Sequence, residues 1–206
     1  MDGLIYFRDG EVVAESGNVT AYLMNERLFL ELGPGHNLWA LEDEYHDYMT
    51  QIWDLPKGSC LEIGLGLGIA SRCILSNPNV RSLTTVEKNS DVIAIQAHLG
   101  RVLDDGSREH KWQYDVNKHK IINKEGLVYM YETRRKYDFV FIDFYQHIDE
   151  ETLPEIADMV NAAKKVLAKD GTILCWLDKY TPNEHLEPFF SLFEDYLPKS
   201  GKELRR

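Results

Sequence analysis

Short apolar runs alternate with helically spaced apolar positions through most of the chain after residue 58. Each run is bounded by glycine or by polar and charged residues, which is typical of buried strands. Between the runs, apolar residues recur every three or four positions, as on one face of an amphipathic helix. The expected strands are 59–63, 82–86, 111–114, 139–142 and 172–177, and the expected helices are 69–75, 91–99, 153–167 and 183–196.

The first part of the chain has a different pattern, in which short extended runs are separated by turns. Leu4–Phe7 and Glu11–Ala14 flank Arg8-Asp9-Gly10, and this arrangement predicts a hairpin. Tyr22–Leu32 is a third extended segment. We therefore expect a small region of β-hairpins here.

A helix follows these hairpins and completes the first part of the chain. Gly33-Pro34-Gly35 breaks the chain, and the apolar spacing over Leu38–Trp53 predicts an amphipathic helix. We assign residues 1–54 to this hairpin-and-helix region and residues 55–206 to the main domain. The strand–helix alternation of the main domain predicts an α/β fold with a doubly wound, mainly parallel sheet.

Composition narrows the classes of protein that fit. The 206 residues include 23 Lys+Arg and 34 Asp+Glu, for a formal net charge of −11. This acidic balance argues against a nucleic-acid partner, which needs a basic surface. No apolar stretch approaches the ~20 residues of a membrane span, and no signal-peptide pattern is visible, so we expect no membrane partner. Cys60, Cys73 and Cys175 are far apart, which predicts no disulfide framework, no metal site and a cytoplasmic location.

A glycine-rich loop directly follows the first strand of the main domain. Gly64, Gly66 and Gly68 alternate with leucines and precede a predicted helix. Glycines in this position let the backbone turn tightly and approach a ligand closely. A dinucleotide fingerprint needs glycine where this chain has Ile69, and the Lys-Ser/Thr of a P-loop is absent. The alternative interpretation is a tight turn that binds no ligand.

Acidic residues follow three other predicted strands. Glu87 lies about 20 residues beyond the glycine loop, where a carboxylate can accept hydrogen bonds from ribose hydroxyls. Asp115 follows 111–114 and is suited to accept from an adenine amino group, while Asp143 ends the most apolar strand. The alternative for each is a turn or solvated acid. Because the carboxyl ends of parallel strands share one edge, we expect these residues to lie together.

The ordered set of motifs resembles the class I S-adenosylmethionine-dependent methyltransferases. The resembling segments are 61–68, 86–88, 114–116, 137–143 and 167–174. The resemblance implies a Rossmann-like fold and S-adenosylmethionine as cofactor. It also implies a set of cofactor-binding residues: Glu62, Gly64, Gly66, Gly68, Glu87, Lys88, Asp115, Val116 and Asp143.

A narrower resemblance points to the spermidine synthases. Glu42–Met49 is similar to their D-E-x-x-Y-H-E segment, which implies that Tyr45 and His46 face the cleft between cofactor and acceptor. The alternative for His46 is an ordinary surface residue. The chain departs from that family in two places. Gln146 replaces the second of two substrate-binding acids, and the glycine loop lacks the aspartate that helps to select a decarboxylated cofactor.

These features predict an enzyme that transfers a methyl group to a small cationic or neutral acceptor, with Asp143, Tyr45 and His46 as catalytic residues. An amine acceptor must lose a proton, for which Asp143 is the candidate base or cation anchor. The first alternative is an aminopropyltransferase that uses decarboxylated S-adenosylmethionine and a diamine. The second alternative is a cofactor-binding protein without transfer activity. Because little sequence follows the last predicted strand, a homodimer that completes the sheet is a further option.

Overall fold

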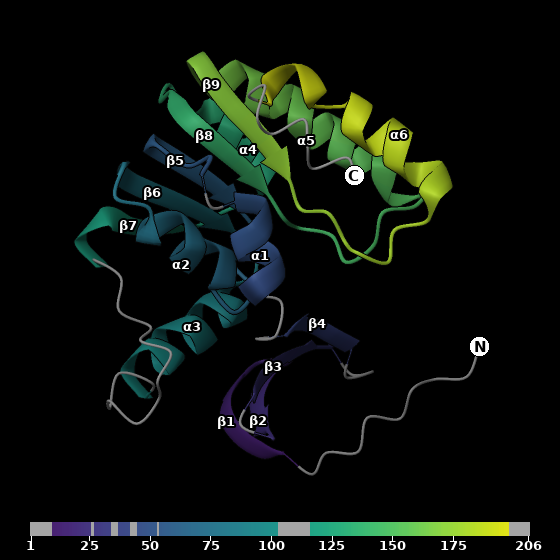
Figure 1. Cartoon of the computed structure of the whole chain (residues 1–206). Coiled ribbons are helices and arrows are strands. Elements are labelled where there is room, and N and C mark those ends of the chain that lie inside the picture. The colour runs from purple at the N-terminus through teal and green to yellow at the C-terminus, as the bar shows by residue number, and fades with distance from the viewer. Residues whose placement is uncertain are drawn as a thin grey trace.

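Two β-sheets organise the protein (Figure 1). The computed structural model describes residues 10–25, 27–33, 37–41, 45–52, 54–102 and 116–197. A four-stranded antiparallel sheet comes first in the chain, and a five-stranded parallel sheet with helices on both faces follows. The predicted fold class is therefore confirmed.

The N-terminal sheet has the strand order β1-β2-β3-β4. Its strands are β1 (Glu11–Ser16), β2 (Val19–Met24), β3 (Arg27–Leu32) and β4 (Asn37–Leu41). The predicted partner strand Leu4–Phe7 lies outside the described residues. Instead, β1 pairs with β2 across a turn at Gly17. The single extended segment predicted over Tyr22–Leu32 is wrong, because a turn at Asn25, whose φ is 51°, divides it between β2 and β3.

The helix predicted over Leu38–Trp53 is also wrong in its first part. Residues 37–41 form β4, and α1 (Tyr45–Ile52) begins only afterwards. Within β4, Trp39 is 38% exposed while its neighbour Ala40 is buried. A period of two suits a strand, and pairing with β3 outweighs the helical spacing of the apolar residues.

The main sheet has the order β7-β6-β5-β8-β9, and every neighbouring pair is parallel. Its strands are β5 (Gly58–Ile63), β6 (Val80–Glu87), β7 (His119–Asn123), β8 (Tyr137–Ile142) and β9 (Leu167–Cys175). The strand order reverses between β5 and β8, and ligands bind at such a switch point in open α/β sheets.

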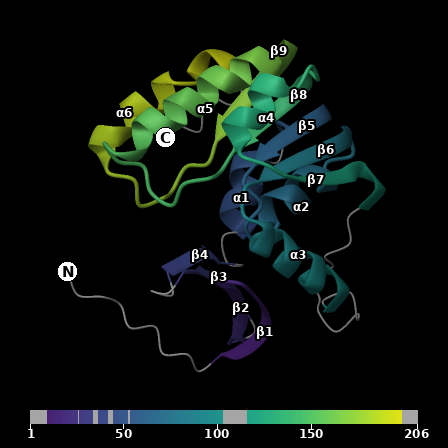
Figure 2. The ribbon, with the colours of Figure 1, turned by 180° about the vertical axis from the view of Figure 1, so that it is seen from behind.

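Helices cover both faces of the main sheet (Figures 1 and 2). On one face lie α1, α2 (Ile69–Ser76) and α3 (Ser90–Val102). On the other face lie α4 (Gly126–Glu132), α5 (Thr152–Val166) and α6 (Asn183–Ser191). The short 3₁₀ helices are η3 (Val116–Lys118) and η4 (Glu194–Tyr196).

The later elements include features that the sequence pattern did not predict. The strand predicted at 111–114 lies outside the described residues, and the strand that pairs with β6 is His119–Asn123. Helix α4 was not predicted at all. The strand predicted at 172–177 begins earlier, at Leu167, and includes Lys169-Asp170-Gly171, where Asp170 has a φ of 60° and the register shifts.

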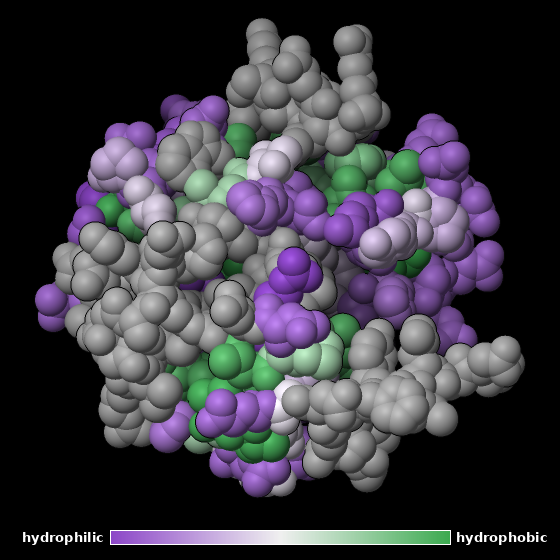
Figure 3. Space-filling model, turned by 60° about the horizontal axis from the view of Figure 1, so that its bottom comes forward, coloured by the Kyte–Doolittle hydropathy of each residue, from purple (hydrophilic) through white to green (hydrophobic). Residues whose placement is uncertain are grey.

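One face of the molecule is seen in the space-filling view. Among the coloured residues in Figure 3, hydrophilic groups lie between separate hydrophobic patches. No helix in the described part of the chain is long and apolar enough to cross a membrane.

Candidate active site

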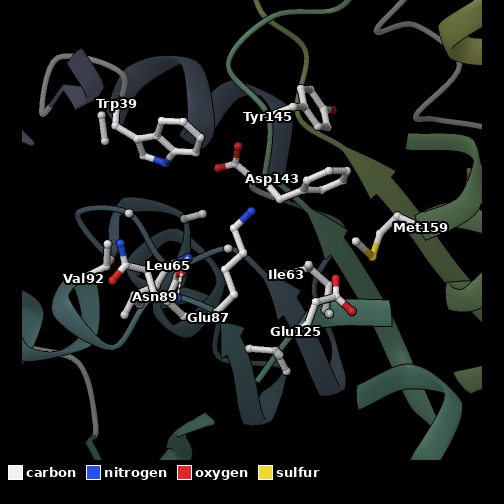
Figure 4. Close-up of a pocket in the computed structure, with 18 of the residues that line it drawn as sticks. Trp39, Ile63, Leu65, Glu87, Asn89, Val92, Glu125, Asp143, Tyr145 and Met159 are labelled. Atoms are coloured by element: carbon white, nitrogen blue, oxygen red, sulfur yellow. Dashed lines mark hydrogen bonds between the residues drawn. The ribbon is translucent and has the colours of Figure 1, made fainter. Parts of the chain in front are cut away.

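A pocket of about 530 Å³ lies at the carboxyl edge of the main sheet (Figure 4). The glycine loop and the ends of β6 and β8 form its floor, while Trp39 and Ala40 of β4 and Tyr48 of α1 come from the N-terminal part of the chain. Helices α4 and α5 contribute Gly126 and Met159. The N-terminal sheet and the main sheet thus build one site together.

The backbone of the glycine loop adopts a conformation that residues with a side chain rarely adopt. Gly64 has a φ of 97°, and a Cβ there would lie 1.8 Å from the carbonyl oxygen of Asp143. Gly66 and Gly68 also have positive φ angles, of 48° and 70°. Gly64 and Gly66 line the pocket, whereas Gly68 packs against Gln96 and starts α2 without lining it. The backbone of this turn is therefore directly available to a ligand.

Glu87 ends β6 and is fixed by the backbone around it. Its Oε2 accepts from the Leu65 amide at 3.0 Å, and its Oε1 accepts from the Asn89 amide at 2.7 Å. Glu87 and the neighbouring Lys88 line the pocket. Each carboxylate oxygen has a second lone pair, so Glu87 can still accept a hydrogen bond from a ligand hydroxyl.

Asp143 follows β8 and bonds to a tyrosine from α1. The Tyr48 hydroxyl donates to Asp143 Oδ2 at 2.5 Å, and the Tyr48 ring stacks on Trp176 with centroids 3.9 Å apart. Burial raises the pKa of Asp143 to about 7, the Tyr48 hydrogen bond acts in the opposite direction, and the charge of Glu87 adds to the rise. Near neutral pH this carboxyl can therefore both hold and release a proton.

Glu62 lies beneath the glycine loop rather than in the pocket lining. It is 0% exposed, and its Oε2 accepts from Ser71 Oγ and Thr85 Oγ1, each at 2.5 Å. Thr85 Oγ1 also lies 2.7 Å from Nε2 of His119. Burial raises the pKa of Glu62 to about 8. Glu62, expected among the cofactor-binding residues, is therefore buried under the loop and does not line the pocket.

The remaining predicted site residues do not join the described pocket. Asp115 lies outside the described residues, as does the side chain of Val116, whose backbone starts η3. Tyr45 starts α1, but its side chain is likewise outside the described part. His46 is exposed and does not line the pocket, so its expected place in the cleft is not observed.

Tyr48 is a pocket residue that sequence analysis missed. The motif resemblance favoured Tyr45 and His46, whereas the helix turns the side chain of Tyr48 toward Asp143. The available signal was weak, because Tyr48 is only one of the helically spaced apolar residues in Leu38–Trp53.

Glu125 was also missed, and it takes the position expected for Asp115. It follows β7, its Oε2 accepts from the Val128 amide at 2.8 Å at the start of α4, and it lines the pocket. The signal was Ile121-Ile122, a short apolar run that ends in polar residues and glycine. An acid after the third strand of the sheet is therefore present, but further along the chain.

The charged residues of the pocket lining are mainly acidic. Among its described residues, Lys88 is the basic side chain, and the acidic ones are Glu87, Glu125, Asp143, Glu155 and Asp158. Such a lining favours a cationic ligand. No group of three or more His, Cys, Asp or Glu side chains suited to a metal ion occurs in the described part.

The fold and the pocket define a class. A parallel sheet with this strand order, a glycine turn after its first strand and a carboxylate at the end of its second strand form a class I methyltransferase-like fold. The N-terminal antiparallel sheet is an addition to this fold.

Curated relatives with detectable sequence similarity carry aminopropyltransferase names. Polyamine aminopropyltransferase 1 of Streptomyces coelicolor is 27% identical over 153 residues, which cover 72% of this chain and 27% of the relative. The polyamine aminopropyltransferase of Leptospira interrogans is 30% identical over 134 residues, which cover 61% of this chain and 25% of the relative. The polyamine aminopropyltransferase of a Ruegeria species is 26% identical over 133 residues, which cover 63% of this chain and 45% of the relative. The chain thus spans less than half of each relative. No family model matches the chain.

Solved structures share the fold at low identity. Spermidine synthase from Thermotoga maritima has a TM-score of 0.64 and 15% identity, with 91% of this chain and 64% of that chain covered. A spermidine synthase in complex with the transition-state analogue AdoDATO has a TM-score of 0.62 and the same identity and coverage. A candidate methyltransferase complexed with SAH has a TM-score of 0.56 and 14% identity, covering 90% and 48%.

Proposed function

We propose that the protein transfers an aminopropyl group from decarboxylated S-adenosylmethionine to a small amine. The observation that carries this proposal is the hydrogen bond between Tyr48 and Asp143 beside the glycine loop, in a pocket whose charged lining residues are mainly acidic. The names of the curated relatives support an amine substrate. We therefore favour aminopropyl transfer over the methyl transfer that was expected from the sequence.

The residues present fit an adenosyl nucleoside. Gly64 and Gly66 expose backbone where side chains would protrude, and this cradle is suited to the nucleoside's sulfur-bound chain. Glu87 is oriented to accept from ribose hydroxyls, and Glu125 is suited to accept from the adenine amino group. When bound, the sulfonium supplies a carbon that is already activated for attack by a nucleophile.

Asp143 prepares the attacking amine. A free alkylammonium has a pKa of about 10, so the acceptor enters the pocket protonated and unreactive. Ionised Asp143 holds the ammonium and accepts its proton, and the Tyr48 hydroxyl fixes the carboxylate that does so. The amine nitrogen then bonds to carbon while the carbon–sulfur bond breaks, leaving a neutral thioether.

Methyl transfer from intact S-adenosylmethionine remains a second candidate because of one residue. Leu67 lines the pocket where the resembling family has an aspartate, and it is 1% exposed. An apolar side chain there provides no negative charge against the carboxylate of the intact cofactor. The choice between the two cofactors is therefore the decisive measurement.

The test compares nucleosides first and products second. Thermal unfolding is measured with intact and decarboxylated S-adenosylmethionine, and a bound ligand raises the apparent stability by mass action. Mass spectrometry then follows diamines and other amines for added aminopropyl or methyl groups. We expect the larger thermal shift with the decarboxylated form and an aminopropyl product.

Two variants separate binding from chemistry. Glu87→Ala should remove the nucleoside-induced thermal shift, whereas Asp143→Asn should retain the shift and lose turnover at least a hundredfold. Methylated products would favour the second candidate. Binding without any product across amines, hydroxyls and thiols would indicate a binding protein, and the absence of any nucleoside-induced shift would refute the adenosyl site itself.

A further inference from the structure

Three carboxyl groups converge at the switch point of the main sheet. Ile63 of β5 is paired with Val86 of β6 on one side and Ile142 of β8 on the other. Glu87 and Asp143 directly follow those two partners, while Glu62 directly precedes Ile63. The three acids therefore come from the ends of three adjacent strands, around the glycine loop.

Glu62 occupies the most buried place in this group. Its Oε1 has no hydrogen-bond donor among the described residues, while Oε2 accepts from two hydroxyls. An ionised Glu62 would leave charge on a buried oxygen without a partner, which is costly. The charges of Asp143 and Glu87 raise the pKa of Glu62 further.

The side chains that face Glu62 give little cationic compensation. The groups around it are Ser71, Thr85, the thiols of Cys60 and Cys73 and, through Thr85, His119. Burial lowers the pKa of His119 to about 4, so its ring is neutral near pH 7. Basic side chains in this region are Lys88 in the pocket lining and Arg72, which is buried in α2.

The side chains that face Asp143 are likewise acidic or neutral. They are the hydroxyls of Tyr48 and Tyr145, the Cys175 thiol, and the carboxyls of Glu87 and Glu62. Without a ligand, Glu62 is therefore largely protonated near pH 7, and Asp143 is protonated in part. A cation placed among these acids favours their ionised forms.

We propose that the ionisation of Glu62 responds to the charge of the bound ligand, although Glu62 does not touch the ligand. When a sulfonium nucleoside binds, Glu62 and Asp143 release protons, and the negative charge that they gain stabilises the sulfonium. A neutral thioether drives no such release. The inference rests on the proposed function, since it assumes that an adenosyl sulfonium occupies the pocket. It makes Glu62 a specificity-determining residue that favours the charged substrate over the uncharged product.

The test measures protons released on binding. The two probes, decarboxylated S-adenosylmethionine and decarboxylated S-adenosylhomocysteine, share the adenosyl group and the aminopropyl chain. They differ by one methyl group on sulfur and by the positive charge that this group brings. Isothermal titration at pH 7.5 in buffers of different ionisation enthalpy gives the number of protons released with each. We expect the sulfonium to release roughly 0.5 to 1 proton more than the thioether. By linkage, the ratio of their affinities then rises up to about tenfold per pH unit between pH 6.5 and 8.

Glu62→Gln is the central variant, because an amide closely matches a protonated carboxyl in size and cannot ionise. It should bind both probes, release fewer protons with the sulfonium and flatten the pH dependence of the affinity ratio. Glu15→Gln, on the exposed part of β1, is the matched control and should behave as wild type.

Several results would overturn the inference. Equal proton release with both probes, or unchanged release in Glu62→Gln, would refute the proposed response of Glu62 to the ligand charge. Either result would leave the proposed function intact. Binding of neither probe would refute both. If the variant fails to fold, carboxyl-labelled glutamate in the wild type gives the answer by NMR. One glutamate should titrate near pH 8 without ligand and at lower pH with the sulfonium, and the absence of that displacement would be decisive against it.

Discussion

Replacing Tyr48 with phenylalanine removes one hydroxyl from the site and leaves the ring. The hydroxyl donates to Asp143 Oδ2 at 2.5 Å, and the ring stacks on Trp176 at an interplanar angle of 17°. Phenylalanine can keep this stacking, so the change acts mainly on the hydrogen bond. Because that bond favours the ionised carboxylate, its loss should raise the pKa of Asp143.

The size of the rise follows from the type of bond. A hydrogen bond to a charged group contributes about 1.5–3 kcal/mol, and about 1.4 kcal/mol corresponds to one pKa unit. The loss should therefore raise the pKa of Asp143 by roughly one to two units, from about 7 in the wild type. Proton acceptance from an amine needs the ionised carboxylate, so the acidic limb of the pH–rate profile should move upward equally.

Carbon-13 NMR of carboxyl-labelled aspartate measures this pKa directly in the ligand-free protein. The pH dependence of transfer gives a second, independent value. Tyr180→Phe is the control, because Tyr180 is 81% exposed and should leave both values unchanged. An unchanged or lower pKa of Asp143 in Tyr48→Phe would refute the role given to this hydrogen bond.

Three further predictions concern the loop, the acid after β7 and the pH dependence of stability. Gly64→Ala should prevent folding or lower the melting temperature by more than 10 °C, because the new Cβ would clash with the Asp143 carbonyl. Gly66→Ala strains only the backbone φ angle, so chemical denaturation should show a free energy of unfolding lower by about 1 kcal/mol. Glu125→Ser retains a capping hydroxyl but loses the carboxylate, so calorimetry should show weaker nucleoside binding with nearly unchanged stability. Folding raises the pKa values of Glu62 and Asp143, so the free energy of unfolding of the ligand-free protein should fall as pH rises from about 4 to 8. In Glu62→Gln, chemical denaturation should show a slope of this free energy against pH that is smaller by about 1.4 kcal/mol per pH unit. Equal slopes in the variant and the wild type would contradict this.

The fold class and much of the pocket floor could be predicted from the sequence. Apolar runs and glycine positions are local signals, and the alternation of strands and helices allows few topologies. Right-handed crossovers then place the carboxyl ends of the parallel strands at one edge. The glycine loop, Glu87 and Asp143 were found in this way, because each directly follows a recognisable strand.

Elements stabilised by partners distant in the sequence could not be placed from local pattern. The segment 119–123 is short and only partly apolar, and it becomes a strand by pairing with β6. Its position determines that Glu125 follows the third strand. Residues 37–41 similarly become a strand through pairing with β3, against their helical spacing.

The sequence by itself determined the alternation of strands and helices in the main domain and the acids at the ends of β6 and β8, since these depend on neighbouring residues. Only the tertiary structure decided that Tyr48 meets Asp143 and that Glu62 is buried beneath the loop. Tyr48 and Asp143 are separated by 95 residues, and their contact depends on how α1 packs against the sheet. The ionisation of these acids follows from the same packing, because burial and neighbouring charge are properties of the assembled site.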